Sequence, residues 1–200
     1  LRSVWQLQQH VSYCLFGSKK HLMNELFEKK NLPFYKFGDA IYLTKIETKY
    51  WIEYICKRFE NTGKHISPEL AEEICRLVDN HSSYVQQLSW LLWIRTINTA
   101  TTEQLTYALE DLLDQNNILF QSETENLSAY QMNFLKAIVD GIHTKFSSKE
   151  VISKYNLGTS ANIVRLKNAL LQKELIETNG KEIVLADPVF GVWFKKEMLY

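Results

Sequence analysis

The dipeptide Asn179-Gly180 lies between two short extended segments near the end of this 200-residue chain, in the stretch ETNGKEIVLAD (177–187). Asn-Gly between two such segments is the strongest short-range signal for a β-hairpin, because both residues accept the positive φ of a tight hairpin turn. Three helical patterns precede the hairpin, over 127–141, 147–156 and 157–176. Three helices followed by a hairpin predict a winged helix-turn-helix for residues 123–200.

Residues 47–122 carry a different pattern, in which four amphipathic stretches follow one another. The second of them begins Ser67-Pro68, a typical N-cap and first helical residue. Apolar residues recur at helical spacing along all four stretches, over 48–59, 67–80, 83–97 and 101–117. A compact helical bundle is the simplest way to bury four such stripes. The polar segment QSETEN (121–126) then predicts a boundary between the bundle and the winged helix.

Residues 1–46 read as helix, strand, helix, loop and strand. VSYCLF (11–16) and AIYLTKI (40–46) are rich in β-branched and aromatic residues, which favours strands. Two strands without neighbours cannot complete a sheet, so this region is expected to be the remnant of an α/β sheet. The predicted fold class is therefore mainly α, with a sheet remnant, a helical bundle and a winged helix.

Composition sets limits on function. The formal net charge is zero, and residues 121–200 carry 10 Lys and Arg against 9 Asp and Glu, so neither half attracts nucleic acid or anionic membrane strongly. The three cysteines lack CxxC spacing and the five histidines lack metal-ligand spacing, so no metal site is expected. No apolar run reaches the ~18 residues of a membrane span. A cytoplasmic protein with free, buried thiols is expected.

The ordered set of sheet remnant, bundle and winged helix resembles the second half of an AAA+ ATPase, and more narrowly the STAND class of bacterial and archaeal signal-transducing P-loop ATPases. The resemblance covers almost the whole chain. It rests on the segments LRSVWQLQQHVSYCLFGSKKHLM, NLPFYKFGDAIYL, HSSYVQQLSWLLW and VLADPVFGVWF, together with the winged helix. It implies a sheet end at 1–46, a helical lid at 47–122 and a winged helix at 123–200.

The resemblance also implies site residues. Gly17-Ser18 would end the strand that carries sensor 1, with the Ser18 hydroxyl facing the terminal phosphate of ATP. An alternative from the residues alone is that Ser18 caps the helix that follows. His81 and Tyr84 would belong to the nucleotide-side loop of the lid, although relatives usually have a proline where this chain has Ser82. His81 could equally be a helix-start residue bonded to backbone.

The chemistry of an ATPase is missing from these residues. The sequence contains neither the GxxxxGK[ST] phosphate loop nor an apolar strand ending in paired acids. In the family both lie upstream, so the chain is expected to be a fragment whose intact parent binds ATP and Mg²⁺ as a nucleotide-dependent switch. The fragment alone is expected to bind neither and not to act as an enzyme.

The winged helix allows a second function, that of a DNA-binding transcription regulator. Its third helix would offer Asn162, Arg165 and Lys167 to the major groove, and its wing would offer Lys181 to the phosphates. A charge of about +1 is small for a duplex-binding domain. A protein partner or self-association through the winged helix is therefore favoured over DNA, and no membrane partner is expected.

Overall fold

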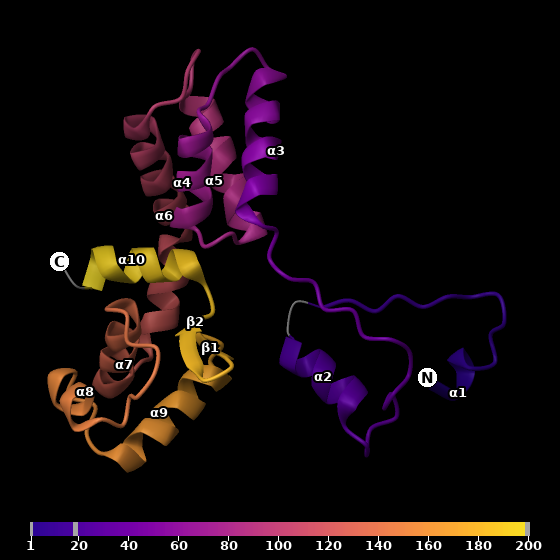
Figure 1. The fold of residues 1–200 in the computed structure, drawn as a ribbon. Helices are drawn as coiled ribbons and strands as arrows, with labels where there is room; N and C mark the ends of the chain where they lie inside the picture. Colours follow the sequence, from indigo (N-terminus) through magenta and orange to yellow (C-terminus); the bar gives the residue numbers. More distant parts are fainter. Residues whose placement is uncertain (1, 18–19, 199–200) are drawn as a thin grey trace. The chain divides into compact units, whose positions relative to one another are not determined.

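The computed structural model describes residues 2–17 and 20–198, and their contacts divide the chain into two compact units, residues 1–44 and 45–200 (Figure 1). We refer to them as unit 1 and unit 2. Every buried residue among those described belongs to unit 2. The two units therefore differ in the most basic requirement for a stable fold, the burial of apolar surface.

Unit 1 contains α1 (Arg2–Trp5) and α2 (Lys20–Glu28), joined to turns and extended segments. Aromatic contacts hold it together. The Trp5 ring stacks on Tyr13 at 4.4 Å between centroids, and the Phe34 ring lies 5.3 Å from Trp5 and 5.9 Å from Phe27. None of these rings is buried, so the cluster is small and open to solvent.

The two strands expected in unit 1 do not form. Residues 11–17 and 39–47 have neither helix nor strand, and the helix expected over 1–10 is confined to α1. A strand is stable only when its N–H and C=O groups pair with a neighbour, and the described part of unit 1 offers none to either segment. Their apolar side chains are left in solvent, with Phe16 and Leu43 each 92% exposed.

The bundle of unit 2 consists of α3 (Thr48–Glu60), α4 (Pro68–Leu77), α5 (Ser82–Arg95) and the first part of α6 (Thr102–Glu125), as the helical periodicity predicts. Ser67 caps α4 by accepting a hydrogen bond from the Leu70 amide at 3.2 Å. At the start of α6, Thr101 and Gln104 form a reciprocal capping box. These caps fix where the helices begin, and their apolar stripes then meet along the bundle axis.

Helix α6 does not stop at the polar segment 121–126. It continues to Glu125, and Asn126 is its C-cap, so the expected bridge is mostly helical. The reason is burial, because Phe120 and Thr124 face inward although their neighbours are polar. Phe120 packs against Phe190 and Trp193 at 5.4 and 5.6 Å between ring centroids. One helix therefore runs from the bundle into the winged helix.

The winged helix follows as predicted. Its elements are α7 (Ala129–Val139), α8 (Lys149–Lys154), α9 (Ser160–Gln172), β1 (Ile176–Asn179), β2 (Glu182–Leu185) and α10 (Pro188–Met198). The strands pair antiparallel around the Asn-Gly turn, with Asn179 opposite Glu182 and Ile176 opposite Leu185. Helix α10 contacts both α6 and α7, and Figure 1 shows it between the bundle and α7.

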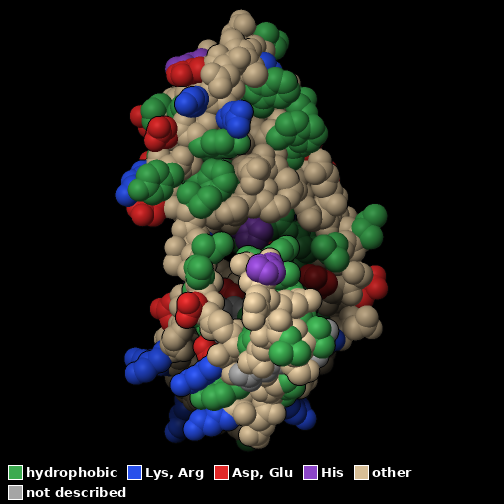
Figure 2. Space-filling model, turned by 90° about the vertical axis from the view of Figure 1, so that its right-hand side faces the viewer, with side chains coloured by type: hydrophobic (Ala, Val, Ile, Leu, Met, Phe, Trp, Pro, Cys, Tyr) green, Lys and Arg blue, Asp and Glu red, His purple; other side chains and the backbone are tan. Residues whose placement is uncertain are grey.

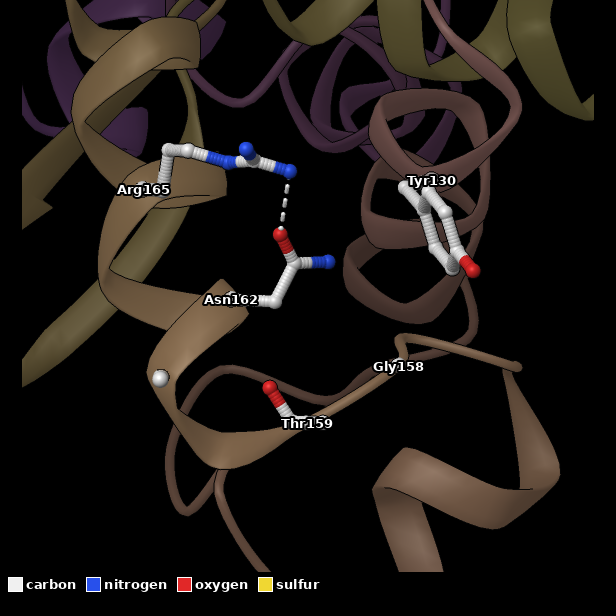
Figure 3. Close-up of a pocket in the computed structure, with 6 residues that line it drawn as sticks. Tyr130, Gly158, Thr159, Asn162 and Arg165 are labelled. Carbon is white, nitrogen blue, oxygen red and sulfur yellow. Dashed lines mark hydrogen bonds between the residues drawn. The ribbon is translucent and has the colours of Figure 1, made fainter.

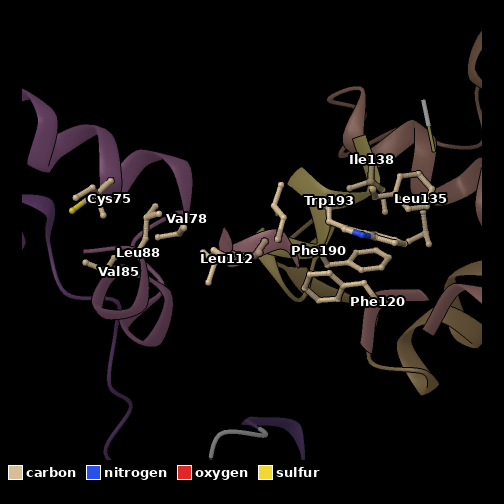
Figure 4. Close-up of a cluster of buried hydrophobic side chains, with 14 of the residues drawn as sticks. Cys75, Val78, Val85, Leu88, Leu112, Phe120, Leu135, Ile138, Phe190 and Trp193 are labelled. Carbon is tan, nitrogen blue, oxygen red and sulfur yellow. The ribbon is translucent and has the colours of Figure 1, made fainter. Parts of the chain in front are cut away.

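Buried side chains run through the whole of unit 2. Figure 4 shows Val78, Val85 and Leu88 grouped within the bundle, and Phe190 and Trp193 grouped at the winged helix. All five are at most 1% exposed. The core is therefore continuous along α6, and the mainly helical fold with a winged helix that the sequence predicts is confirmed.

Candidate functional site

The residues expected at the end of the sensor strand are only partly placed. Gly17 is exposed and lies in the irregular segment after residue 10. A Cβ at Gly17 would lie 3.3 Å from the Met23 sulfur, so the glycine allows the chain to pass close to α2. Ser18 lies outside the described residues. Its role as a sensor stays a prediction, as does its alternative role as a cap.

His81 and Tyr84 lie at the start of α5, where a tight turn positions them. Asp79 and Asn80 both adopt positive φ, at 48° and 53°, and reverse the chain between α4 and α5. His81 is the N-cap residue of α5, but its side chain makes no capping hydrogen bond. Its ring lies 4.7 Å from the Tyr84 ring, and its Nδ1 atom is buried without a partner among the described residues.

Tyr84 connects the bundle to the winged helix. Its hydroxyl donates a hydrogen bond to Oδ2 of Asp187 at 2.5 Å, across 103 residues of sequence. The other carboxylate oxygen of Asp187 accepts from the amides of Val189 and Phe190 at 2.8 and 3.0 Å. Asp187 therefore caps α10 and holds α5 at the same time. Burial and the bond to Asp187 both raise the pKa of Tyr84, so the hydroxyl keeps its proton.

A second carboxylate completes this junction. Burial, and secondarily the charge of Asp187, raise the pKa of Glu123 on α6. Helix α5, helix α6 and the residue that caps α10 thus each contribute a polar side chain to one partly buried place: Tyr84, Glu123 and Asp187. We call these three residues the junction cluster.

The resemblance pointed to Tyr84 as a residue of the nucleotide-side loop, and that role, like that of His81, stays a prediction. Nothing in the sequence pointed to the contact of Tyr84 with Asp187 or to Glu123 beside it. Asp187-Pro188 at the start of a helical pattern is a signal for an N-cap, and it could have identified the capping role. No local signal reveals that Tyr84 is the partner, because the two residues meet only after the whole winged helix has folded.

Two of the predicted DNA-contact residues on α9, the third helix of the winged helix, are hydrogen-bonded to each other. Nδ2 of Asn162 donates to the Leu157 carbonyl at 2.8 Å, and its Oδ1 accepts from the Arg165 guanidinium at 2.8 Å. Figure 3 shows Arg165 turned toward Asn162 across a shallow hollow from Tyr130. The hollow has a volume of about 420 Å³ and also adjoins Gly158, whose φ of +83° sets the turn before α9.

The other two predicted DNA-contact residues, Lys167 and Lys181, lie in different surroundings. Lys167 is half-buried on α9, whereas Lys181 is exposed at the tip of the wing. Exposed Glu177 and Glu182 lie on the strands of the same wing. Carboxylates beside Lys181 reduce its attraction for a phosphate backbone. The structure therefore brings Asn162 and Arg165 together, whereas Lys167 and Lys181, also among the described residues, are not bonded to them.

The described residues hold no group of His, Cys, Asp and Glu suited to a metal ion. The thiols differ in their surroundings, since Cys14 is exposed and Cys75 is buried. Burial raises the pKa of Cys75 to about 11, which makes it a poor nucleophile. No helix among the described residues is long and apolar enough to cross a membrane.

Comparison with known proteins adds to this picture. Residues 118–196 match the model of a family described as a probable winged helix domain. That match begins inside α6, so the second part of this helix belongs to the winged helix. No curated protein matches the chain.

The fold is similar to that of the Walker-type ATPase PABY2304 of Pyrococcus abyssi, with a TM-score of 0.61 and 18% sequence identity. The similarity covers 87% of this chain and 50% of that one, so the chain spans about half the length of the ATPase. The chain is therefore a helical bundle and winged helix that shares its fold with part of a Walker-type ATPase.

Proposed function

We propose that the chain is the lid and winged helix of a STAND-class AAA+ P-loop ATPase, and that its parent acts as a nucleotide-dependent switch. The parent would bind ATP with Mg²⁺ through parts that these residues lack, since they contain no phosphate loop. The shared fold with part of a Walker-type ATPase and the winged helix at residues 118–196 support this assignment.

The observation that carries the proposal is the hydrogen bond between Tyr84 and Asp187. The family resemblance puts Tyr84 in the loop of the lid that faces the nucleotide. The same residue is bonded to the carboxylate that begins α10 of the winged helix. A nucleotide that shifts the loop would therefore change a contact of the winged helix directly, which is the differential interaction that a switch requires.

The surroundings of Tyr84 also define what this loop can do. The carboxylates of Asp187 and Glu123 lie close to its hydroxyl and would repel a triphosphate. The junction cluster therefore does not fit a phosphate site. Its chemistry fits a mechanical role. A movement of the loop would shift Tyr84, and the hydrogen bond to Asp187 would transmit this shift to the start of α10.

The winged helix is proposed to act on a protein partner or a second copy of the chain. Arg165 is held by Asn162, and Lys181 lies on a wing that also carries Glu177 and Glu182, so two of the predicted contacts are poorly placed to neutralise phosphates. Duplex binding relies on many such contacts. This arrangement supports protein contact over DNA contact.

The proposal is tested by titrating a fluorescent ATP analogue into this chain and into a protein extended upstream by about 150 residues, the size of a nucleotide-binding half. We expect binding only to the longer protein. In that protein, ATP should change hydrogen exchange in α10, and Tyr84→Phe should abolish the change while leaving ATP affinity intact. Tyr107→Phe is the matched control, because Tyr107 is exposed and its hydroxyl donates to Glu103 of the same helix, α6.

Three results would overturn the proposal. The longer protein could fail to bind ATP, or ATP could leave α10 unchanged. Alternatively, the chain could shift a DNA duplex in a gel, with the shift lost when Arg165→Ala and Lys167→Ala are combined. That last outcome would assign the winged helix to DNA.

A further inference from the structure

Helices α3 and α5 enclose an apolar pocket on the side of the bundle, with a volume of about 460 Å³. Aromatic side chains form most of its wall, from Trp51 and Tyr54 on α3 and from Trp90 and Trp93 on α5. Trp90 is 56% exposed, which is unusual for so large an apolar ring. The upper part of Figure 2 shows hydrophobic side chains gathered on this side of the molecule, where α3 faces the viewer.

The size and lining of the pocket favour a small molecule. Small-molecule sites have volumes of about 300–1,000 Å³ and are mostly apolar with a few polar groups. Flat aromatic walls suit a planar ligand, because offset and edge-to-face contacts between rings are favourable. The Trp93 indole is already fixed by its bond to the Thr62 hydroxyl at 2.9 Å, so part of the wall is rigid before any ligand arrives.

The charge at the pocket indicates the sign of the ligand. Arg58 is the charged residue among those lining it, and it lies over the Tyr54 ring at 5.0 Å. The positions three and four residues away along α3 hold no acid, and the described residues show no ion pair for this guanidinium. Its positive charge is therefore available to an anion.

Two lining residues also have unused hydrogen-bonding capacity. The Trp51 indole N–H and the Ser89 hydroxyl are both buried and have no partner among the described residues. A buried donor without a partner costs free energy, which an acceptor oxygen on a ligand would recover. Both atoms are shut off from solvent, so the ligand would reach them through a small side-chain shift of the kind common on binding.

The geometry points to a binding site in this pocket for a small planar aromatic carboxylate. Its ring would lie between Trp51 and Trp90, and its carboxylate would face Arg58 at the rim and accept from Ser89. The pocket lies between α3 and α5 and does not involve the junction cluster, so the inference stands apart from the proposed nucleotide switch.

The test is isothermal titration calorimetry of the 200-residue chain with two probes of one shape, 2-naphthoate and 2-naphthamide. We expect one naphthoate per chain and about fivefold weaker binding of the neutral amide, the size of a partly exposed charge interaction. Arg58→Gln should remove the difference between the probes. Lys57→Gln, its neighbour on α3 outside the pocket, should preserve it.

Two further variants test the wall and the buried hydroxyl. Trp90→Ala should weaken both probes about tenfold, since it removes one aromatic wall. The side chain is mostly exposed, so the variant should remain folded. Ser89→Ala should weaken naphthoate about fivefold through the lost donor.

The inference is overturned if naphthoate does not bind, or if Trp90→Ala leaves its affinity unchanged. It is also overturned if light scattering finds a dimer that Trp90→Ala dissociates while naphthoate shows no binding. The pocket would then be a contact between copies of the chain. None of these experiments contains nucleotide, so their failure leaves the proposed switch untouched.

Discussion

In unit 2, apolar side chains from α3 to α10 pack into one core whose members include Phe59, Phe120 and Trp193, each at most 2% exposed, whereas in unit 1 Phe16 and Leu43 are both 92% exposed. Both regions contain aromatic and β-branched segments. The difference lies in what surrounds them, because helices can bury a stripe against their sequence neighbours and a strand needs a partner along its edge. Unit 2 therefore has the means to fold by itself, whereas the described part of unit 1 buries no residue and packs its aromatic rings in an open cluster.

Thiol labelling at pH 8 should give the largest contrast between the units. Cys14 of unit 1 is exposed, whereas Cys75 of unit 2 is buried with a pKa near 11. We expect Cys75 to react at least ~1,000-fold more slowly than Cys14, because it becomes accessible only when unit 2 opens. Mass spectrometry of each cysteine peptide measures the two rates. Comparable rates would mean that the core of unit 2 is not closed.

Truncating one aromatic residue in each unit should give the next largest contrast. Trp193→Ala should lower the free energy of unfolding of unit 2 by about 3–5 kcal/mol, through a cavity beside Phe120 and Phe190. Phe34→Ala in unit 1 should change the same transition by less than about 0.5 kcal/mol. Urea denaturation measures both. A large effect of Phe34→Ala would show that unit 1 contributes to the core transition.

Alkaline pH should weaken unit 2 through Tyr84. The pKa of this hydroxyl is raised above its ordinary value of 10.0, so its contribution is present below pH 10 and is lost as pH rises through the folded-state pKa. Tyr84→Phe should cost about 1–2 kcal/mol at pH 8 and should make the decline above pH 10 shallower. The measurement is urea denaturation across this range, with Tyr107→Phe as the control. An unchanged alkaline decline in Tyr84→Phe would contradict the expectation.

Neutralising Glu123 should have the smallest effect. The pKa of Glu123 is raised, so the protonated form favours folding, and this contribution is lost as pH rises through the folded-state pKa. Glu123→Gln should therefore stabilise unit 2 at pH 7, by about 0.5 kcal/mol for a partly exposed group. The gain should disappear near pH 4, where Glu123 is protonated anyway. Destabilisation at pH 7 would contradict this expectation, because it would show that the charge of Glu123 stabilises the folded protein.

Much of unit 2 could be predicted because its signals are local. Apolar stripes, the Ser67-Pro68 start of α4 and the Asn179-Gly180 turn each specify structure within a few residues, and the structure confirms all three elements. The continuation of α6 through residues 121–125 could not be predicted, since the burial of Phe120 at this end of the helix depends on Phe190 and Trp193 of α10, far away in sequence.

The prediction of two strands in unit 1 was wrong because strand formation also depends on distant residues, here on a neighbouring strand that the described part of unit 1 lacks. VSYCLF and AIYLTKI have the composition of strands. Composition indicates that a segment gains from burial, but it does not specify the neighbouring strand that would bury it. The junction cluster shows the same limit, because the resemblance pointed to Tyr84 as a loop residue while its bond to Asp187 could be found only in three dimensions.

The central claim is that Tyr84 and Asp187 join the bundle to the winged helix. A double-mutant cycle tests it most directly, with unfolding free energies measured for Tyr84→Phe, Asp187→Ala and the combination. We predict a coupling energy of about 1–2 kcal/mol, as for a hydrogen bond to a charged group. Additivity within about 0.3 kcal/mol would contradict the claim, because it would mean that the two residues stabilise the protein independently.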